Sequence, residues 1–304
     1  MQEGSVGNLG DFRQYLESLG RAELTVRGYL QDMRDFARWF AGTNGVELSP
    51  ERLTSQDVRE YRQHLLAVRR AKPALVNRRI AAIRAYVRWG RREGLIQGNP
   101  LEGVRPVREQ ERGPRWLTRQ ERNALVRELE LMVQGARTPH WRLQAIRDRA
   151  VVFLMLHAGL RVGELVSLEV GDIELGERSG EVRVRRGKGG KERTVPLNAE
   201  VRRALWDWLE VRPKVESPYL FVGKGGGRLR DSGVQKRVAE IGRRAGVELT
   251  PHVLRHTFAR MLVEAGVGLE RVAALLGHES LDTTKVYLTP SMADLQEAVE
   301  RVSG

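Results

Sequence analysis

The sequence predicts a mainly α-helical protein of two domains, the second of which carries a small β-hairpin. Three observations lead to this prediction. The 304 residues are enough for two domains of ordinary size. Apolar residues recur at helical spacing along most of the chain, and a run of Gly and Pro residues interrupts that spacing over residues 98–115. We therefore expect domains at residues 1–97 and 116–304, joined by a linker at 98–115.

Four helices account for the expected first domain. In each, apolar residues stand three or four positions apart, as do Val76, Ile80, Ile83 and Val87, and this spacing gives a helix one apolar face. Such a domain is a small helical bundle. The four segments are expected at residues 12–19, 29–40, 54–66 and 73–90.

The expected second domain combines helices with one β insertion. Thr118 followed by Glu121 is a capping box that predicts a helix start. Residues 182–184 and 194–197 alternate as strands do, and the glycine-rich turn 187–190 between them predicts a β-hairpin. The remaining segments have helical spacing and lie at 125–133, 145–156, 198–211, 232–245, 252–265, 269–276, 281–288 and 292–302.

The charge of the chain predicts a polyanionic partner. There are 52 Lys and Arg against 39 Asp and Glu, a net charge of +13, and most of the basic residues are arginine, whose planar guanidinium suits phosphate oxygens. Residues 69–92 contain no acidic side chain, whereas a solvated helix face normally mixes both signs. We interpret this stretch as a helix on duplex DNA, with a merely exposed basic helix as the alternative. The expected DNA contacts are Arg69, Arg70, Lys72, Arg78, Arg79, Arg84 and Arg88.

Several classes of protein are disfavoured by composition. The chain has no cysteine, which excludes disulfides, thiolate metal sites and cysteine nucleophiles. The longest apolar run, 150–156, is too short for a membrane span, and residues 1–10 lack the pattern of a signal peptide. We expect a cytoplasmic protein without membrane contact.

No metal or nucleotide cofactor is expected. His252 and His256 have the spacing of two zinc ligands, but the residue after His252 is not the glutamate of metalloproteases, and Arg255 would place a cation beside the metal. The glycine-rich stretches 187–190 and 223–227 lack the ending of a nucleotide-binding loop.

Six residues of the second domain have the chemistry of phosphoryl transfer, although each alone is ordinary. Arginines can bind the non-bridging oxygens of a dianionic phosphorane, imidazoles can bond to it and move protons, an acid can protonate the leaving oxygen, and a hydroxyl can attack. Glu164 could orient the nearby guanidinium of Arg161. The six residues are Arg161, Lys188, His252, Arg255, His278 and Tyr287.

The order and surroundings of these residues resemble the tyrosine recombinases, also called the phage integrase family. The resemblance covers nearly the whole chain. The total length of the chain and its compact linker are most like those of the bacterial Xer group. The matching blocks are GLRVGEL at 159–165, GKGGKER at 187–193, PHVLRHTFA at 251–259 and LLGH at 275–278. Leu288 after the tyrosine, and a longer stretch at 131–140, depart from the Xer pattern.

The resemblance implies a two-domain DNA clamp and a site-specific recombination reaction. The first domain is then a SAM-like core-binding bundle that closes on double-stranded DNA opposite the catalytic domain. Tyr287 attacks a phosphodiester to form a 3′-phosphotyrosyl intermediate and a free 5′-hydroxyl, without metal or ATP. Four protomers, as a homotetramer or a heterotetramer, act through a Holliday junction, as in Xer-type resolution of chromosome or plasmid dimers.

The resemblance also implies a role for each of the other five residues. Arg161 and Arg255 bind the phosphate and His278 bonds to it. His252 acts as general base, and Lys188 protonates the departing 5′-oxygen.

The C-terminal segment is expected to dock on a neighbouring protomer, with packing on its own domain left open, and a DNA translocase is a possible activator. The apolar residues of this segment are Met292, Leu295, Val299 and Val302. Three other readings stay open: an integrase or transposon recombinase of a mobile element, a DNA-binding architectural protein without catalysis, and a type IB topoisomerase.

Overall fold

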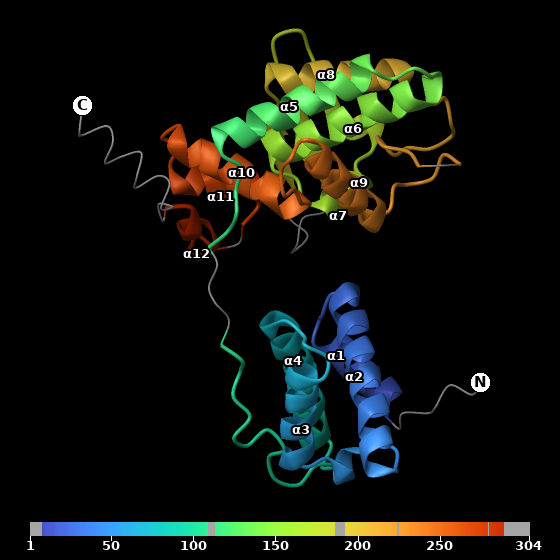
Figure 1. Cartoon of the computed structure of the whole chain (residues 1–304), viewed down its shortest axis with the longest axis vertical. Coiled ribbons are helices and arrows are strands. Elements are labelled where there is room, and N and C mark those ends of the chain that lie inside the picture. Colours follow the sequence, from blue (N-terminus) through green and yellow to red (C-terminus); the bar gives the residue numbers. More distant parts are fainter. Residues whose placement is uncertain (1–7, 109–112, 186–191, 224, 279, 289–304) are drawn as a thin grey trace. The chain divides into compact units, whose positions relative to one another are not determined.

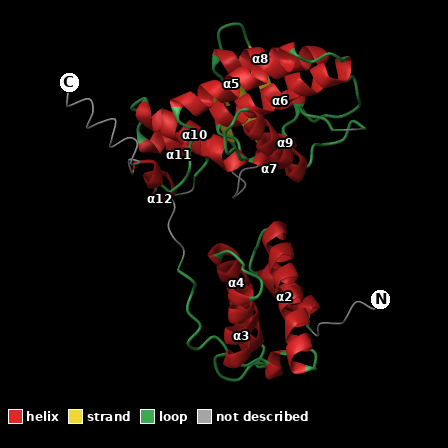
Figure 2. Ribbon diagram, viewed as in Figure 1, coloured by secondary structure: helices red, strands yellow, loops and turns green. Residues whose placement is uncertain are grey.

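The computed structural model describes residues 8–108, 113–185, 192–223, 225–278 and 280–288, and it divides the chain into two compact units, 1–111 and 112–304 (Figure 1). Helices make up most of both units (Figure 2), which confirms the mainly α-helical prediction. Over the described ranges, none of the helices is long and apolar enough to cross a membrane.

The first unit is a bundle of four helices around one apolar core. Helix α4 packs against the other three, and Phe12 of α1 meets Tyr86 of α4 edge to face, with ring centroids 5.3 Å apart. Helix α2 begins earlier than its apolar spacing predicts, at Glu23. The helices are α1 (Leu9–Ser18), α2 (Glu23–Asn44), α3 (Ser55–Ala67) and α4 (Pro73–Arg92), with the short 3-10 helix η1 (Pro50–Arg52) before α3.

The second unit combines helices with a small antiparallel sheet of three strands. The expected hairpin is present as β2 and β3, with Val182 opposite Val195, and β1 adds a strand that the spacing did not predict, with Ile173 opposite Val182. The expected turn 187–190 lies outside the described residues. The strands are β1 (Ile173–Leu175), β2 (Gly180–Val184) and β3 (Arg193–Pro196), in that order across the sheet, and the 3-10 helix η2 (Val170–Asp172) precedes β1.

The helices of the second unit agree with the expected segments except for the short helix α7, which is additional, and near the C-terminus. There, residues 281–288 form one short helix and one 3-10 turn rather than a continuous helix, and the expected helix 292–302 lies outside the described residues. The helices are α5 (Arg119–Gln134), α6 (Pro139–Ala158), α7 (Val162–Ser167), α8 (Ala199–Val211), α9 (Asp231–Arg244), α10 (Pro251–Glu264), α11 (Leu269–Leu276), α12 (Asp282–Lys285) and η3 (Val286–Leu288).

Helix α6 is the centre of the second unit. It lies beside α5 and α8 (Figure 1) and also contacts α7 and α10. Almost every side chain from Ala145 to Ala158 is buried, and the run 150–156 within it is apolar on all sides, as expected for a helix at the centre of a core. Because α6 ends directly before the 159–165 block, this rigid helix positions the first of the predicted functional residues.

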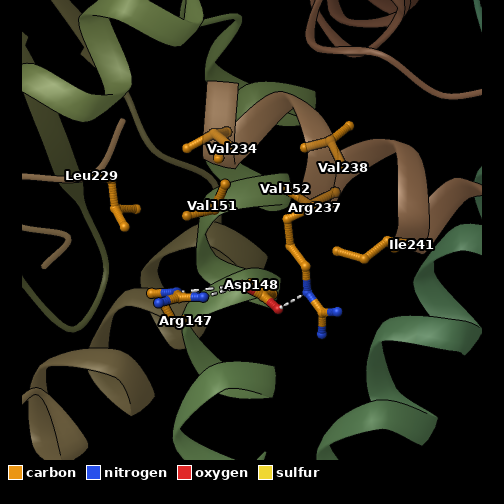
Figure 3. A pocket seen from close by; sticks show the side chains of 10 residues that line it. Arg147, Asp148, Val151, Val152, Leu229, Val234, Arg237, Val238 and Ile241 are labelled. Carbon is orange, nitrogen blue, oxygen red and sulfur yellow. Dashed lines mark hydrogen bonds and ion pairs between the residues drawn. The ribbon is translucent and has the colours of Figure 1, made fainter. Parts of the chain in front are cut away.

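A pocket between α6 and α9 is lined by apolar side chains and, on one side, by a cluster of paired charged side chains (Figure 3). The buried carboxylate of Asp148 accepts hydrogen bonds from Arg237 Nε at 2.5 Å and from Arg147 Nη2 at 3.1 Å. A buried carboxylate is tolerated when cations pair with it. The cluster therefore fastens α9 to α6, and we assign it a structural role.

Gly242 in α9 offers a test of how tightly this unit is packed. A Cβ atom at this position would lie 2.4 Å from Leu249 Cβ and 2.6 Å from the Val247 carbonyl oxygen. We expect Gly242→Ala to lower the free energy of unfolding by about 1–3 kcal/mol, because backbone and core must move apart. Urea unfolding measures this change.

Gly233→Ala in the same helix is the matched control. No atom lies within 4 Å of a Cβ there, so the better helix propensity of alanine should raise stability by up to about 1 kcal/mol. Equal effects of the two substitutions would contradict the packing described for Gly242.

Candidate active site

The C-terminal end of α11 gathers three arginines that come from three different elements. The carbonyl oxygens of residues 275, 276 and 277 accept hydrogen bonds from Arg193, Arg255 and Arg161 in that order, at 3.0, 2.6 and 3.3 Å. The last carbonyls of a helix lack partners within the helix and carry the negative end of its dipole. This helix end therefore holds three guanidinium groups close together.

Glu164 is the carboxylate that binds two of these arginines. Its oxygens accept two hydrogen bonds from Arg193, at 2.9 and 2.8 Å, and one from Arg161 Nη1 at 2.8 Å. The same carboxylate accepts the Arg161 backbone N–H at 2.8 Å and so caps α7. Burial by itself would raise the pKa of Glu164, but the hydrogen bonds and charges of Arg193 and Arg161 outweigh it and lower that pKa. Glu164 is thus a fixed anion under two cations.

Gly277 allows Arg193 to lie against the end of α11. Its φ of +64° is left-handed, and a Cβ there would lie 2.9 Å from Arg193 Nη1. Only glycine meets both conditions without strain or displacement. Gly277 is therefore required for the packing of Arg193, an arginine that was not among the six residues predicted from the sequence.

Arg255 is the most deeply buried of the three arginines. It projects from α10, which begins at Pro251 after the capping residue Thr250, and its Nη1 also donates to the Gly159 carbonyl at 2.5 Å. Burial and the charge of Arg161 lower the pKa of Arg255 to about 10, so it remains charged at neutral pH. Arg161 is more open, with 31% of its side chain exposed. Arg255 thus supplies a positive charge in the protein interior, and Arg161 supplies one at the surface.

Tyr287 lies in η3 beside these arginines and is only 2% exposed. Its hydroxyl forms a hydrogen bond of 2.6 Å with Nδ1 of His256, and its carbonyl accepts from Arg260 Nη1 at 3.0 Å. Burial raises the pKa of the Tyr287 hydroxyl, although Arg255 and Arg161 act in the opposite direction. The tyrosine is therefore protonated at neutral pH in this conformation.

The histidines of the site differ in their surroundings. His278, half-buried, shares a hydrogen bond of 2.9 Å with the Thr284 hydroxyl, and burial together with Arg255 and Arg161 lowers the pKa of His278 to about 4. His252 is exposed, and its ring centroid lies 6.4 Å from that of His256. Within the described ranges, no group of three or more His, Asp or Glu side chains could hold a metal ion.

The structure thus brings four of the six predicted residues to one place, namely Arg161, Arg255, His278 and Tyr287. His252 stands at the edge of this group, and Lys188 lies outside the described residues. Two functional candidates are added, Arg193 and His256, and Glu164 has the orienting contact expected of it. Sequence reasoning considered His256 only as a metal ligand. Its place directly after Arg255 in the 251–259 block was the available signal.

The basic stretch of the first unit is exposed with one exception. Arg79 is 17% exposed and turned inward, where it donates to Asp35 at 2.8 Å and to the Tyr61 hydroxyl at 3.0 Å. Arg78 is paired with Asp32 at 2.7 Å but is largely exposed. The contacts of Arg79 with Asp35 and Tyr61 connect α4 to α2 and α3. The other predicted DNA-contacting residues are exposed: Arg69, Arg70, Lys72, Arg84 and Arg88.

Comparison with known proteins finds relatives along nearly the whole chain. The profile of the phage integrase family matches residues 115–294, and that of the phage integrase N-terminal SAM-like domain matches residues 9–96. The tyrosine recombinase XerA of Pyrococcus furiosus is 34% identical over 301 residues, which cover 97% of this chain and 93% of that protein.

Two solved structures share the fold. The XerH site-specific recombinase bound to a palindromic difH substrate has a TM-score of 0.74 at 21% identity, covering 96% of this chain and 85% of that one. The Tn1549 transposon integrase in complex with a circular intermediate DNA has a TM-score of 0.70 at 18% identity, covering 98% and 100% of the two chains.

The two half-buried histidines generate a prediction about stability and pH. The pKa values of His256 and His278 are lowered from 6.5 to about 4 in the folded protein. Between these values the unfolded chain binds protons that the folded chain does not, so the free energy of unfolding falls as the pH falls from 6.5 to about 4. Urea unfolding across this range measures the slope. The double variant His256→Gln/His278→Gln should flatten it, and a wild-type slope in that variant would contradict the assignment.

Proposed function

The chain belongs to the phage integrase family of tyrosine recombinases, and we propose that it cuts and rejoins DNA strands at a specific duplex site with Tyr287 as the nucleophile. One observation carries this proposal. A buried tyrosine stands beside two arginines that are already held in place: Arg161 by the Glu164 carboxylate and the Gly277 carbonyl, and Arg255 by backbone carbonyls that include the one of Leu276 at the end of α11. Such a site has a nucleophile and a preformed place for a phosphate group.

The arginines supply the electrostatic part of the reaction. Arg161 and Arg255 bind the non-bridging oxygens of the phosphate and stabilise the added negative charge of the phosphorane, for which they are already oriented. Because Glu164 and the Gly277 carbonyl fix Arg161, and the Leu276 carbonyl fixes Arg255, before DNA binds, little reorganisation is needed at the moment of reaction. His278, next to the Gly277 carbonyl that Arg161 binds, adds a hydrogen bond to the phosphate.

The covalent step conserves the energy of the phosphodiester bond. The Tyr287 oxygen attacks phosphorus, the bond to the 5′-oxygen breaks, and Lys188 protonates that oxygen. The product is a 3′-phosphotyrosyl protein and a free 5′-hydroxyl. Attack by the 5′-hydroxyl of a partner strand reverses the step and joins the strands through a Holliday junction. Family resemblance assigns the proton of the Tyr287 hydroxyl to His252.

We further propose an Xer-type role in resolving chromosome or plasmid dimers. The similarity to XerA along nearly the full length of both chains supports it. Four protomers would assemble on two sites through the C-terminal segment 289–304, which lies outside the described residues, and a DNA translocase is a candidate activator. The shared fold with a transposon integrase keeps a mobile-element recombinase as the second candidate.

The nucleophile is tested by covalent capture. Wild-type protein incubated with nicked, sheared genomic DNA of its source should retain DNA through detergent denaturation, and Tyr287→Phe should lose the adduct completely, because phenylalanine has no attacking oxygen. Tyr219→Phe, the other tyrosine of residues 112–304, is the matched control and should keep the adduct.

The captured DNA also separates the alternatives. A single chromosomal site supports the Xer-type role, whereas ends of a mobile element support the second candidate. An adduct with Tyr287→Phe would overturn the nucleophile, binding without any adduct would indicate an architectural protein, and plasmid relaxation without site preference would indicate a topoisomerase.

The exposed arginines of α4 are tested by salt dependence. Arg84 and Arg88 are one helical turn apart and exposed. The double variant Arg84→Ala/Arg88→Ala should reduce the slope of log K against log salt for a duplex by about 0.9 for each phosphate that is no longer neutralised. Arg13→Ala, an exposed arginine of α1 paired with Glu17, is the control. An unchanged slope in the double variant would remove α4 from the DNA surface.

A further inference from the structure

Thr284 brings a buried hydroxyl to the site, and the reaction proposed above does not use it. The residue is 0% exposed, and its Oγ1 lies 2.9 Å from Nδ1 of His278. Thr284 belongs to α12, which packs beside α11 (Figure 1), and His278 directly follows the Gly277 carbonyl that Arg161 binds. A hydroxyl is costly to bury unless it is hydrogen-bonded. The bond to His278 is thus the contact that makes a hydroxyl favourable at this position.

The proton on the His278 ring decides whether this residue can bind a phosphate. Burial, followed by the charges of Arg255 and Arg161, lowers the pKa of His278 to about 4, so the imidazole is neutral at neutral pH. A neutral imidazole has one N–H, on either Nδ1 or Nε2. Because non-bridging phosphate oxygens only accept hydrogen bonds, the nitrogen that faces the phosphate must be the one that carries the proton. With Nδ1 against Thr284, that nitrogen is Nε2.

We propose that Thr284 is a positioning residue whose hydroxyl donates a hydrogen bond to Nδ1 of His278, so that Nε2 carries the hydrogen that the imidazole presents to the phosphate. This inference rests on the proposed function, because it concerns the phosphate-binding histidine of the same site. A hydroxyl suits the position, since it can donate to a neutral imidazole. A carboxylate or carbonyl oxygen could only accept, and it would draw the proton to Nδ1.

The second ring nitrogen of His278 is available for the phosphate. Across the residues that the structure describes, Nε2 has no hydrogen-bond partner, and the ring is only half-buried. The two nitrogens lie on different edges of the ring, so a bond at Nδ1 also fixes the direction of Nε2. Turning the ring over would break the bond to Thr284. Thr284 therefore sets both the tautomer of the imidazole and its orientation.

The segment that carries Thr284 also carries the nucleophile. Thr284 and Tyr287 are three positions apart, and α12 runs directly into η3. Residues 282–288 thus meet the phosphate-binding histidine through one side chain and supply the attacking oxygen through another. The conformation that places Tyr287 in the site is therefore also the one that orients His278.

Single-turnover cleavage of a nicked duplex that carries the captured site tests the hydroxyl. Thr284→Val, which has nearly the same shape, should cleave about 10- to 100-fold more slowly than wild type, the loss typical when a group that orients a functional imidazole is removed. Duplex binding should be unchanged, because Thr284 does not touch DNA in this proposal. Thr284→Ser keeps the hydroxyl and should restore most of the rate.

The neighbouring threonine is the matched control. Thr283 lies on the same short helix and is exposed, so Thr283→Val should cleave as wild type does. Cleavage by Thr284→Val at the wild-type rate would overturn the proposal. A Thr284→Ser variant as slow as Thr284→Val would overturn it as well, because packing rather than the hydroxyl would then matter. Urea unfolding shows whether each variant is folded under the assay conditions.

A double-mutant cycle separates positioning from general destabilisation. If Thr284 acts through the imidazole, Thr284→Val should slow cleavage in wild type but have no further effect in His278→Ala, which has no ring to orient. Losses that multiply in the double variant would show that Thr284 acts independently of His278, against the proposal.

Nitrogen NMR reads the tautomer directly and without DNA. In protein made with ¹⁵N-labelled histidine, the ring signals of His278 are identified by their loss in His278→Gln, and protonated and bare ring nitrogens have well-separated shifts. At neutral pH the wild-type proton should be on Nε2, Thr284→Val should change the balance of tautomers, and Thr283→Val should not.

A wild-type proton on Nδ1, or a tautomer balance that Thr284→Val leaves unchanged, would refute the role of Thr284. If wild type forms no DNA adduct, the proposed function fails instead, and this spectrum still decides the contact between Thr284 and His278.

Discussion

The catalytic unit depends on one electrostatic arrangement, in which three guanidinium groups are held side by side by a carboxylate and a helix end. Like charges at short range repel one another strongly where water is excluded. Glu164 and the carbonyls of residues 275–277 supply the opposing negative charge and accept the hydrogen bonds. The arginines that await a phosphate are thereby stable without one, and the site remains positively charged overall.

The tyrosine side of the site follows from the arginine side. Burial lowers the pKa values of His256 and His278, and Arg255 lowers both further, joined by Arg161 at His278, so these imidazoles are neutral when no anion is bound. Burial keeps the Tyr287 hydroxyl protonated in the same state.

The fold positions these groups at the ends of its elements. Arg161 is the N-cap residue of α7, in the short link that follows the buried helix α6, Arg193 begins β3, and the binding carbonyls lie at the end of α11. Elements packed into a rigid core fix the places of their terminal residues, while the termini themselves retain unpaired backbone groups. The apolar core of the second unit is therefore what holds the site in shape, and clusters such as Asp148 with Arg237 fasten its helices to one another.

The sequence by itself determined most helices, the hairpin and the order of the motif residues, because helical spacing, capping boxes and glycine turns are local signals. It did not determine which partner each side chain meets. Arg79 belongs to a run of basic residues but pairs with Asp35, 44 positions earlier, and Arg255 binds the carbonyl of Gly159, 96 positions away. His256 and His252 share one helix and one spacing, and only the packing of η3 against α10 decides which imidazole the tyrosine touches. Periodicity shows which face of an element is apolar, whereas the partner across that face is chosen by chain segments far apart in sequence.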